Sequence, residues 1–171
     1  MKTALDFAEL FETHYSRLYA YIRSKVNDRE TAEDLTAATF ERAFSRSQMF
    51  DPEKGSFTTW LFSIGRNLVI NHYTTTSRKP APYNLDEMAE IPAAHLSPEQ
   101  VLLRQEQHLL LAEALPTLSE RDQEIIQLKF FGRVSNRDIA QMLDLKEKTV
   151  SVIVLRALQK LKTRLERQDA S

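Results

Sequence analysis

The chain has 171 residues, of which 42% are hydrophobic and 27% are charged, and its formal net charge is −1. This composition can bury a core in one domain or in two small ones. There is no cysteine, which excludes disulfides, thiolate metal sites and cysteine nucleophiles. The four histidines lack metal-binding spacing, so we expect no metal and no cofactor. No window is apolar enough to span a membrane or to form a signal peptide, so we expect a soluble cytoplasmic protein.

Helical periodicity dominates the first part of the chain. Long apolar stripes with a spacing of three or four residues, together with only three glycines, predict an all-α protein. The first helix is expected over about residues 5–26, and the second begins near Asp28, with acidic residues in its first turn, and continues through Phe44. A turn containing Asp51, Pro52 and Gly55 then leads into a third helix.

The third helix, expected over residues 57–73, has two different faces. Its apolar stripe consists of Phe57, Leu61, Ile64 and Leu68. Roughly opposite lie Thr59, Ser63, Arg66 and Asn67, with Trp60 at the border. No glycine ends this helix, and the residues from Thr74 to Lys79 are expected to form a basic loop rich in hydroxyl groups.

A proline-rich acidic segment interrupts the helical pattern at residues 80–98 and is expected to be a linker. It divides the chain into an N-terminal domain, 1–79, and a C-terminal domain, 99–171. Ser97 as N-cap and Pro98 at the first helical position predict a new helix there, which ends near Leu115. Another helix is expected to begin at residues 118–120.

The segment from Ser135 to Leu161 fits a helix-turn-helix. Ser135 and Asp138 predict a capped start, Asp144 stands where the turn favours glycine, and the expected inward positions are Ile139, Ala140, Leu143, Leu145, Val150 and Ile153. The simpler alternative is a plain helical hairpin. Residues 146–167 carry seven basic and two acidic side chains, so duplex DNA is the expected partner.

The second helix of this motif is unusually apolar for a recognition helix. Its expected outward positions are Lys148, Thr149, Ser151, Val152, Leu155 and Arg156. Val152 and Leu155 could contact thymine methyl groups or dock a protein partner, and Leu155 could instead pack on the preceding helix. The sequence leaves these alternatives open.

Four stretches together resemble the extracytoplasmic-function (ECF) group of sigma factors of bacterial RNA polymerase, in the sigma-70 family. They are FETHYSRLYAY at 11–21, AEDLTAATFERA at 32–43, FDPEKGSFTTWLFSIGRNL at 50–68 and the helix-turn-helix. The resemblance implies a sigma factor that binds core polymerase, recognises promoter DNA as duplex and as single strand, and opens it. It implies no catalytic activity, and it implies regulation by an anti-sigma protein. The acidic linker would thread the polymerase cleft.

The resemblance also implies three sets of site residues. The clamp helices of the largest polymerase subunit would meet Glu33, Asp34, Thr36, Thr39 and Arg42. The minus-ten promoter element would be bound by Trp60, Arg66, Asn67, Asn71, Thr74, Thr75, Arg78 and Lys79. The minus-thirty-five element would be bound by Lys148, Thr149, Ser151, Val152 and Arg156. The sequence departs from the family at Ala38, where glutamate is common, and at Lys146, where a serine usually caps the helix.

The minus-ten set has a physical rationale of its own. Capture of single-stranded DNA requires aromatic surfaces for stacking, cations for the backbone and small polar groups for an extruded base. These residues supply all three kinds of group, although Trp60 could equally be a core aromatic.

Three rival functions remain to be weighed. A helix-turn-helix regulator that acts as a dimer on palindromic DNA would leave Arg66, Asn67 and the threonine run without a role. A helical enzyme would need a constellation of reactive groups that the sequence does not contain. In a third reading, the C-terminal domain is chiefly a protein-docking module.

Overall fold

The computed structural model describes residues 5–76 and 97–170. All regular elements in these two ranges are helices, which confirms the predicted all-α class. They are α1 (Phe7–Lys25), α2 (Arg29–Ser45), η1 (Ser47–Met49), α3 (Phe57–Thr76), α5 (Pro98–Ala114), η2 (Leu115–Thr117), α6 (Glu120–Ile126), η3 (Gln127–Phe131), α7 (Asn136–Leu143) and α8 (Glu147–Asp169). The expected linker, apart from its last residues, lies outside the described residues.

Side-chain caps set the starts of several helices. Asp28 accepts a hydrogen bond from the backbone N–H of Thr31 at 3.0 Å, so α2 begins one residue after it. Ser97 and Gln100 form a reciprocal capping box at α5, as the serine and proline at that point predict. Ser135 caps α7 through the N–H of Asp138 at 3.1 Å. The structure thus confirms the expected helix starts. Each cap involves only residues close in the sequence, which is why the sequence alone could predict it.

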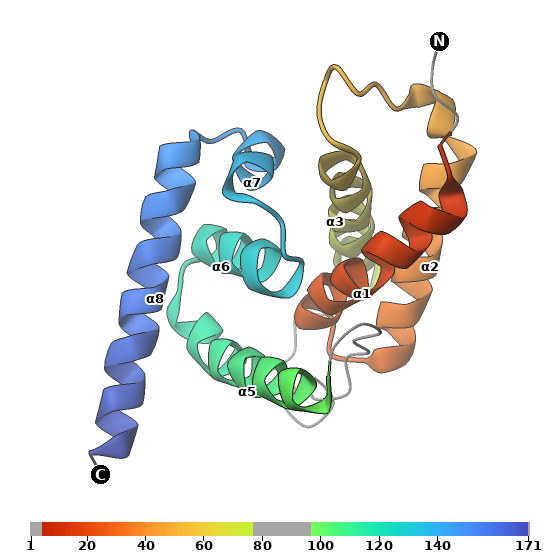
Figure 1. The fold of residues 1–171 in the computed structure, drawn as a ribbon. Coiled ribbons are helices and arrows are strands. Elements are labelled where there is room, and N and C mark those ends of the chain that lie inside the picture. The colour runs from red at the N-terminus through yellow and green to blue at the C-terminus, as the bar shows by residue number, and fades with distance from the viewer. Residues whose placement is uncertain (1–4, 77–96, 171) are drawn as a thin grey trace.

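Helices α1, α2 and α3 form an N-terminal bundle, and α5 to α8 form a second bundle on the other side of the molecule (Figure 1). The N-terminal core includes Leu18, Ile22, Phe40 and Leu61, none more than 3% exposed. Gly65 permits a close helix crossing, since a Cβ there would lie 3.0 Å from the side chain of Leu18. The third helix is thereby held firmly against the first.

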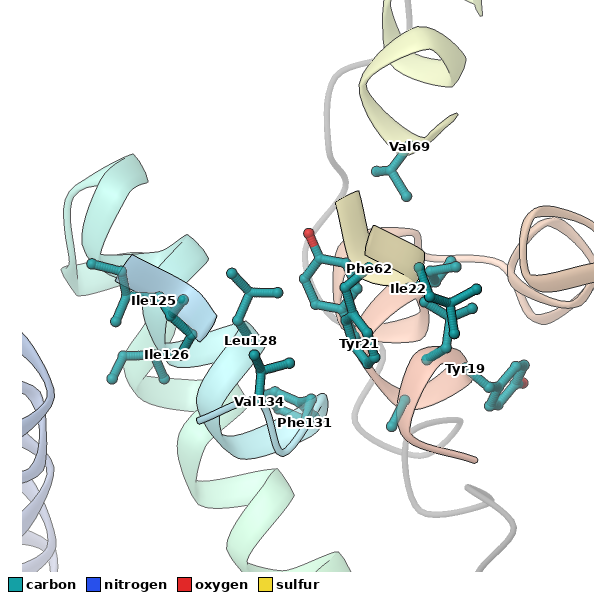
Figure 2. Close-up of a cluster of buried hydrophobic side chains, with 14 of the residues drawn as sticks. Tyr19, Tyr21, Ile22, Phe62, Val69, Ile125, Ile126, Leu128, Phe131 and Val134 are labelled. Carbon is teal, nitrogen blue, oxygen red and sulfur yellow. The ribbon is translucent and has the colours of Figure 1, made fainter. Parts of the chain in front are cut away.

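The two bundles share one continuous hydrophobic core. Tyr21 and Phe62 extend from the N-terminal bundle toward Leu128 and Phe131 of the C-terminal one (Figure 2). A Cβ on Gly132 would lie 2.7 Å from the ring of Phe62, so the absence of a side chain permits this approach. The described domains are therefore packed against each other.

This packing changes the expected division of α3 into two faces. Thr59 was predicted to lie opposite the core stripe, yet it is only 8% exposed and its hydroxyl lies 3.0 Å from that of Ser56. Phe62 and Val69, which lie outside the predicted stripe, are 0% and 3% exposed. The prediction of a single buried stripe was wrong here because the C-terminal domain covers a second side of the helix.

The turn between α7 and α8 has the geometry predicted for a helix-turn-helix. Asp144 adopts a left-handed backbone conformation, with φ 54° and ψ 49°, and the next N–H, that of Leu145, bonds to the carbonyl of Ala140 at 2.9 Å. Val150 and Ile153 face the interior, at 0% and 4% exposure. The predicted inward positions of the second helix are thus confirmed.

The conformation of Asp144 generates a test of the turn. Asp144→Gly and Asp144→Ala remove the same exposed carboxylate, but only glycine adopts the left-handed conformation without a steric penalty. We expect the free energy of unfolding of the alanine variant to be about 1 kcal/mol lower than that of the glycine variant. Urea denaturation of the two proteins measures this difference, and equal midpoints would contradict the proposed backbone constraint.

Candidate nucleic-acid interface

Helix α2 presents an acidic surface near its N-terminus. Glu33 and Asp34 are exposed, and Glu33 accepts a hydrogen bond from Nε of Arg29 at 3.0 Å. Arg42 is half-buried on the same helix. These three expected polymerase-binding side chains are accessible at least in part.

The other two expected polymerase contacts, Thr36 and Thr39, are buried. Both are 0% exposed, and their hydroxyls donate hydrogen bonds at 2.7 Å to the carbonyls of Ala32 and Leu35. Helix α2 packs against both α1 and α3, so these short polar side chains lie within the bundle. In this structure they can orient α2 but cannot touch a partner, and direct contact would have to come from Glu33, Asp34 and Arg42.

A polar stripe runs along the outer side of α3. Asn67, Asn71, Thr74 and Thr75 are all exposed, and their spacing of four, three and one residues aligns them on one face. Earlier on the helix, Trp60 is half-buried, with its ring centroid 5.3 Å from Phe50 and 5.8 Å from Phe57. Its ring therefore packs on the edge of the core and is also partly open to solvent.

The expected loop at the end of α3 is helical as far as Thr76. The hydroxyls of Thr74 and Thr76 donate to the carbonyls of Ile70 and His72, four residues earlier, at 2.9 and 2.7 Å. The prediction of a loop from Thr74 was wrong. The threonine hydroxyls bond to carbonyls of their own helix, so the helix continues through the threonine run. Arg78 and Lys79 lie outside the described residues.

Arg66 does not join the polar stripe but faces the C-terminal domain. Its Nε atom lies 3.3 Å from Oε1 of Glu124, on α6. Lys25 forms an ion pair with Oε2 of the same carboxylate, and the hydroxyl of Tyr21 donates to Oε1 at 2.5 Å. Burial and the charge of Glu124 raise the pKa of Tyr21 well above its usual value, so its hydroxyl remains a donor.

A cleft of about 850 Å³ opens beside this cluster. Its walls include Lys25 and Arg66 from the N-terminal bundle, Glu120 and Glu124 from α6, and Thr74 at the end of the polar stripe. Sequence reasoning missed Glu124. The signal was present, since a glutamate precedes the buried Leu128 and Phe131 by four and seven residues, the spacing of a helix face.

Helix α8 presents the expected basic surface. All seven cationic residues of the segment 146–167 are exposed: Lys146, which directly precedes the helix, and Lys148, Arg156, Lys160, Lys162, Arg164 and Arg167 within it. Among the other expected reading residues, Ser151 and Val152 are exposed and Thr149 is half-buried. Ser151 accepts a hydrogen bond from Nδ2 of Asn136 at 3.2 Å, which links α8 to the start of α7.

One alternative for the apolar residues of α8 is now excluded. Leu155 is 57% exposed and Val152 is 38% exposed, so Leu155 does not pack on the preceding helix. Leu158 is also 40% exposed. The outward side of the helix therefore carries apolar groups among its cations and remains available to DNA or to a protein.

Within residues 5–76 and 97–170, no cluster of histidine and acidic side chains is placed to hold a metal ion. None of the helices in this part of the chain is both long and apolar enough to cross a lipid bilayer.

Comparison with known proteins identifies both halves of the chain. Residues 10–79 match the family Sigma-70 region 2, and residues 108–161 match Sigma-70, region 4. The chain is 32% identical over 164 residues to the ECF RNA polymerase sigma factor BldN of Streptomyces coelicolor, covering 96% of this chain and 61% of BldN. It is 27% identical over 166 residues to the RNA polymerase sigma factor YlaC of Bacillus subtilis, covering 95% and 93% of the two chains.

Solved structures show the same fold. CnrH, determined in complex with the cytosolic domain of CnrY, aligns with a TM-score of 0.65 at 25% identity, covering 94% of this chain and 88% of CnrH. RpoE of Bartonella quintana, determined with the anti-sigma factor NepR, aligns with a TM-score of 0.64 at 22% identity, covering 94% and 97%. The chain therefore belongs to the sigma-70 family, in the group of ECF sigma factors.

The exposure of Val152 and Leu155 generates a stability prediction. Replacing either residue by glutamine is expected to change the free energy of unfolding by no more than about 0.5 kcal/mol, because neither side chain is buried. Val150→Ala, at a fully buried position of the same helix, is expected to cost about 1–3 kcal/mol. Urea denaturation compares the three, and a loss at Leu155 as large as that at Val150 would show that Leu155 belongs to the core.

Proposed function

We propose that this protein is an RNA polymerase sigma factor that binds core polymerase, recognises a promoter and opens it for transcription initiation. The observation that carries this proposal is the joint match to regions 2 and 4 of the sigma-70 family, on two bundles with separate polar surfaces. The protein acts by binding, without catalytic chemistry of its own. Its place of action is the cytoplasm, where promoter DNA and polymerase are found.

The acidic surface of α2 is the proposed contact with core polymerase. Glu33 and Asp34 are exposed and would face basic groups on the clamp of the largest subunit, with Arg42 beside them. Thr36 and Thr39 would contribute indirectly, because both are buried in the packing of α2 and their hydroxyls are satisfied by carbonyls of the same helix. Exposed charges of this kind favour rapid and correctly oriented association.

The polar stripe of α3 is the proposed surface for the minus-ten element. Asn67 and Asn71 carry amide groups that can donate and accept hydrogen bonds, as recognition of an extruded base requires. Trp60 offers the partly exposed edge of an aromatic ring, and Arg66 would supply a cation for the backbone. Arg78 and Lys79 complete the proposed site from outside the described residues.

The outward surface of α8 is the proposed contact with the minus-thirty-five element. Lys148, Thr149, Ser151 and Arg156 offer hydrogen-bonding groups, and Val152 offers an apolar contact for a thymine methyl group. The exposed cations beyond residue 156 would bind phosphates and position the helix in the major groove. In this proposal the N-terminal domain, 1–79, binds the minus-ten element and the C-terminal domain, 99–171, binds the minus-thirty-five element, with the acidic linker between them.

An anti-sigma protein is the proposed regulator. The solved relatives CnrH and RpoE were determined in complex with CnrY and with the anti-sigma factor NepR. A comparable partner of this chain would compete with polymerase and DNA for the surfaces described above.

Core binding provides the first test. We expect the protein to co-elute with bacterial core polymerase and to support initiation on a promoter library. The double variant Glu33→Gln with Asp34→Asn should weaken core binding by about tenfold, since it removes two exposed charges from the proposed contact. Glu9→Gln with Glu12→Gln makes the same charge change on exposed positions of α1 and should leave core binding unchanged. Failure of the wild type to bind core, with tight binding to palindromic duplex DNA, would instead support a dimeric regulator.

Promoter selection tests the role of α8. In the holoenzyme, Val152→Asn should change the base preference in the upstream element, whereas Lys160→Gln, which removes an exposed cation beyond residue 156, should weaken binding to all promoters alike. Selection from a randomised upstream element, followed by sequencing, measures both effects. If Val152→Asn lowers initiation on all promoters equally, the apolar residue docks a protein and does not read DNA.

A further inference from the structure

We propose that Lys25 and Arg66 form a phosphate-binding pair for single-stranded promoter DNA, and that Glu124 occupies this pair in the free protein. This inference rests on the proposed function, because it adds a residue, Lys25, to the minus-ten surface. It also assigns a regulatory role to Glu124, a carboxylate of the opposite domain.

The carboxylate of Glu124 is surrounded by groups that could also bind a phosphate. Glu124 is 9% exposed, and its two oxygens are shared between Tyr21, Lys25 and Arg66, all from the N-terminal domain. One carboxylate thus contacts two cations and a hydroxyl, an arrangement that a DNA phosphate could also satisfy. The proposed DNA-binding residue Arg66 has its charge directed at another part of its own chain.

The two cations lie close to the polar stripe of α3. Lys25, Arg66 and Thr74 line the same cleft. Thr74 is also one end of the exposed stripe on α3, so a strand lying on that stripe could extend its backbone to the two cations once Glu124 had withdrawn. Lys25 and Arg66 are therefore placed to bind phosphate beside the bases that the stripe is proposed to read.

The contact between Glu124 and Arg66 is incomplete. Among the described residues, Nε of Arg66 is buried without a hydrogen-bond partner of suitable geometry, although it lies 3.3 Å from Glu124. The contact is thus an ion pair without the directional bond that guanidinium groups form in strong pairs. A phosphate that approached in a better orientation would compete well with Glu124.

Other contacts hold the two domains in the position that places Glu124 in the pair. Arg17 donates from Nε to the carbonyl of Gly132 at 3.0 Å and from Nη2 to that of Arg133 at 2.9 Å. Separation of the domains would break these bonds and release Glu124 at the same time. Binding of core polymerase to the N-terminal domain would expose the pair if it favours the separated state.

The test measures binding of the free protein to a short, fluorescent single-stranded DNA of mixed sequence. Glu124→Gln should raise affinity by about tenfold, because the amide still accepts from Tyr21 but no longer neutralises the two cations. Glu120→Gln makes the same charge change on an exposed residue of the same helix, lining the same cleft, and should raise affinity by no more than about twofold. Adding Lys25→Gln to the Glu124→Gln protein should remove most of the gain.

For a second variant, the proposal predicts a change in DNA affinity opposite to the change that the loss of one positive charge would cause. Arg17→Gln removes a cation, which by itself lowers affinity for DNA, but it also removes two bonds between the domains. The proposal expects affinity to rise. Because the chain has no cysteine, spin labels at Glu41→Cys and Glu106→Cys, exposed residues of α2 and α5, can report the distance between the domains.

Both Glu124→Gln and Arg17→Gln should broaden this distance distribution toward longer values. Equal affinities for Glu124→Gln and Glu120→Gln, or lower affinity for Arg17→Gln, would overturn the proposal. This test can fail while the proposed function holds, because initiation by the wild-type protein with core polymerase tests the sigma activity independently. Wild-type initiation without any gain from Glu124→Gln would reject the masked pair alone.

Discussion

The relative position of the two domains depends on a nearly buried carboxylate, Glu124. Removing a charge from water is costly, and three groups of the other domain, from Tyr21, Lys25 and Arg66, compensate for that cost. Buried ion clusters of this kind add little net stability, but the loss of one partner is costly because it leaves an uncompensated buried charge. A contact of this kind is compatible with the proposed opening of the interface, since water can solvate all four groups when they separate.

The apolar part of the same interface has a different role. Phe62 packs over Gly132, and its ring lies near Tyr21 and opposite Leu128 and Phe131 (Figure 2). Opening the domains would expose these side chains to water, which the hydrophobic effect opposes. A partner that holds the open state must therefore offer binding energy of its own. In the proposed function, core polymerase supplies it through α2, a helix whose acidic residues remain exposed in the packed state.

Local sequence signals predicted the local structure well. The caps at Asp28, Ser97 and Ser135 and the left-handed turn at Asp144 depend on neighbouring residues, and the structure confirms them. The extent of α3 was harder to predict, because a threonine run permits either a loop or a helix whose hydroxyls bond to its own carbonyls. Periodicity alone could not distinguish these outcomes.

At the candidate site, the residues that are less accessible than their polar character suggests owe this to tertiary packing. Thr36 and Thr39 are polar, and only the crossing of α2 with its two neighbours makes them interior. Arg66 is next to Asn67 in the sequence and is also polar, but its guanidinium group forms an ion pair with the adjacent domain. The exposure of a polar side chain on a helix depends on what covers that side, and a single sequence does not contain this information for a domain joined through a linker.

The packed state affects the two proposed DNA surfaces unequally. Helix α8 lies on the side of the molecule away from the N-terminal bundle (Figure 1), and its cations are exposed, so duplex DNA could reach them while the domains remain together. On α3 the asparagines are exposed, but the cation next to them is held by Glu124. Hydrogen-bonding groups without backbone neutralisation bind single strands weakly, since phosphate contacts supply much of the affinity. Strand capture would then require domain separation, whereas duplex attachment would not. This asymmetry would confine strand capture to the polymerase-bound state, in which an opened promoter is useful.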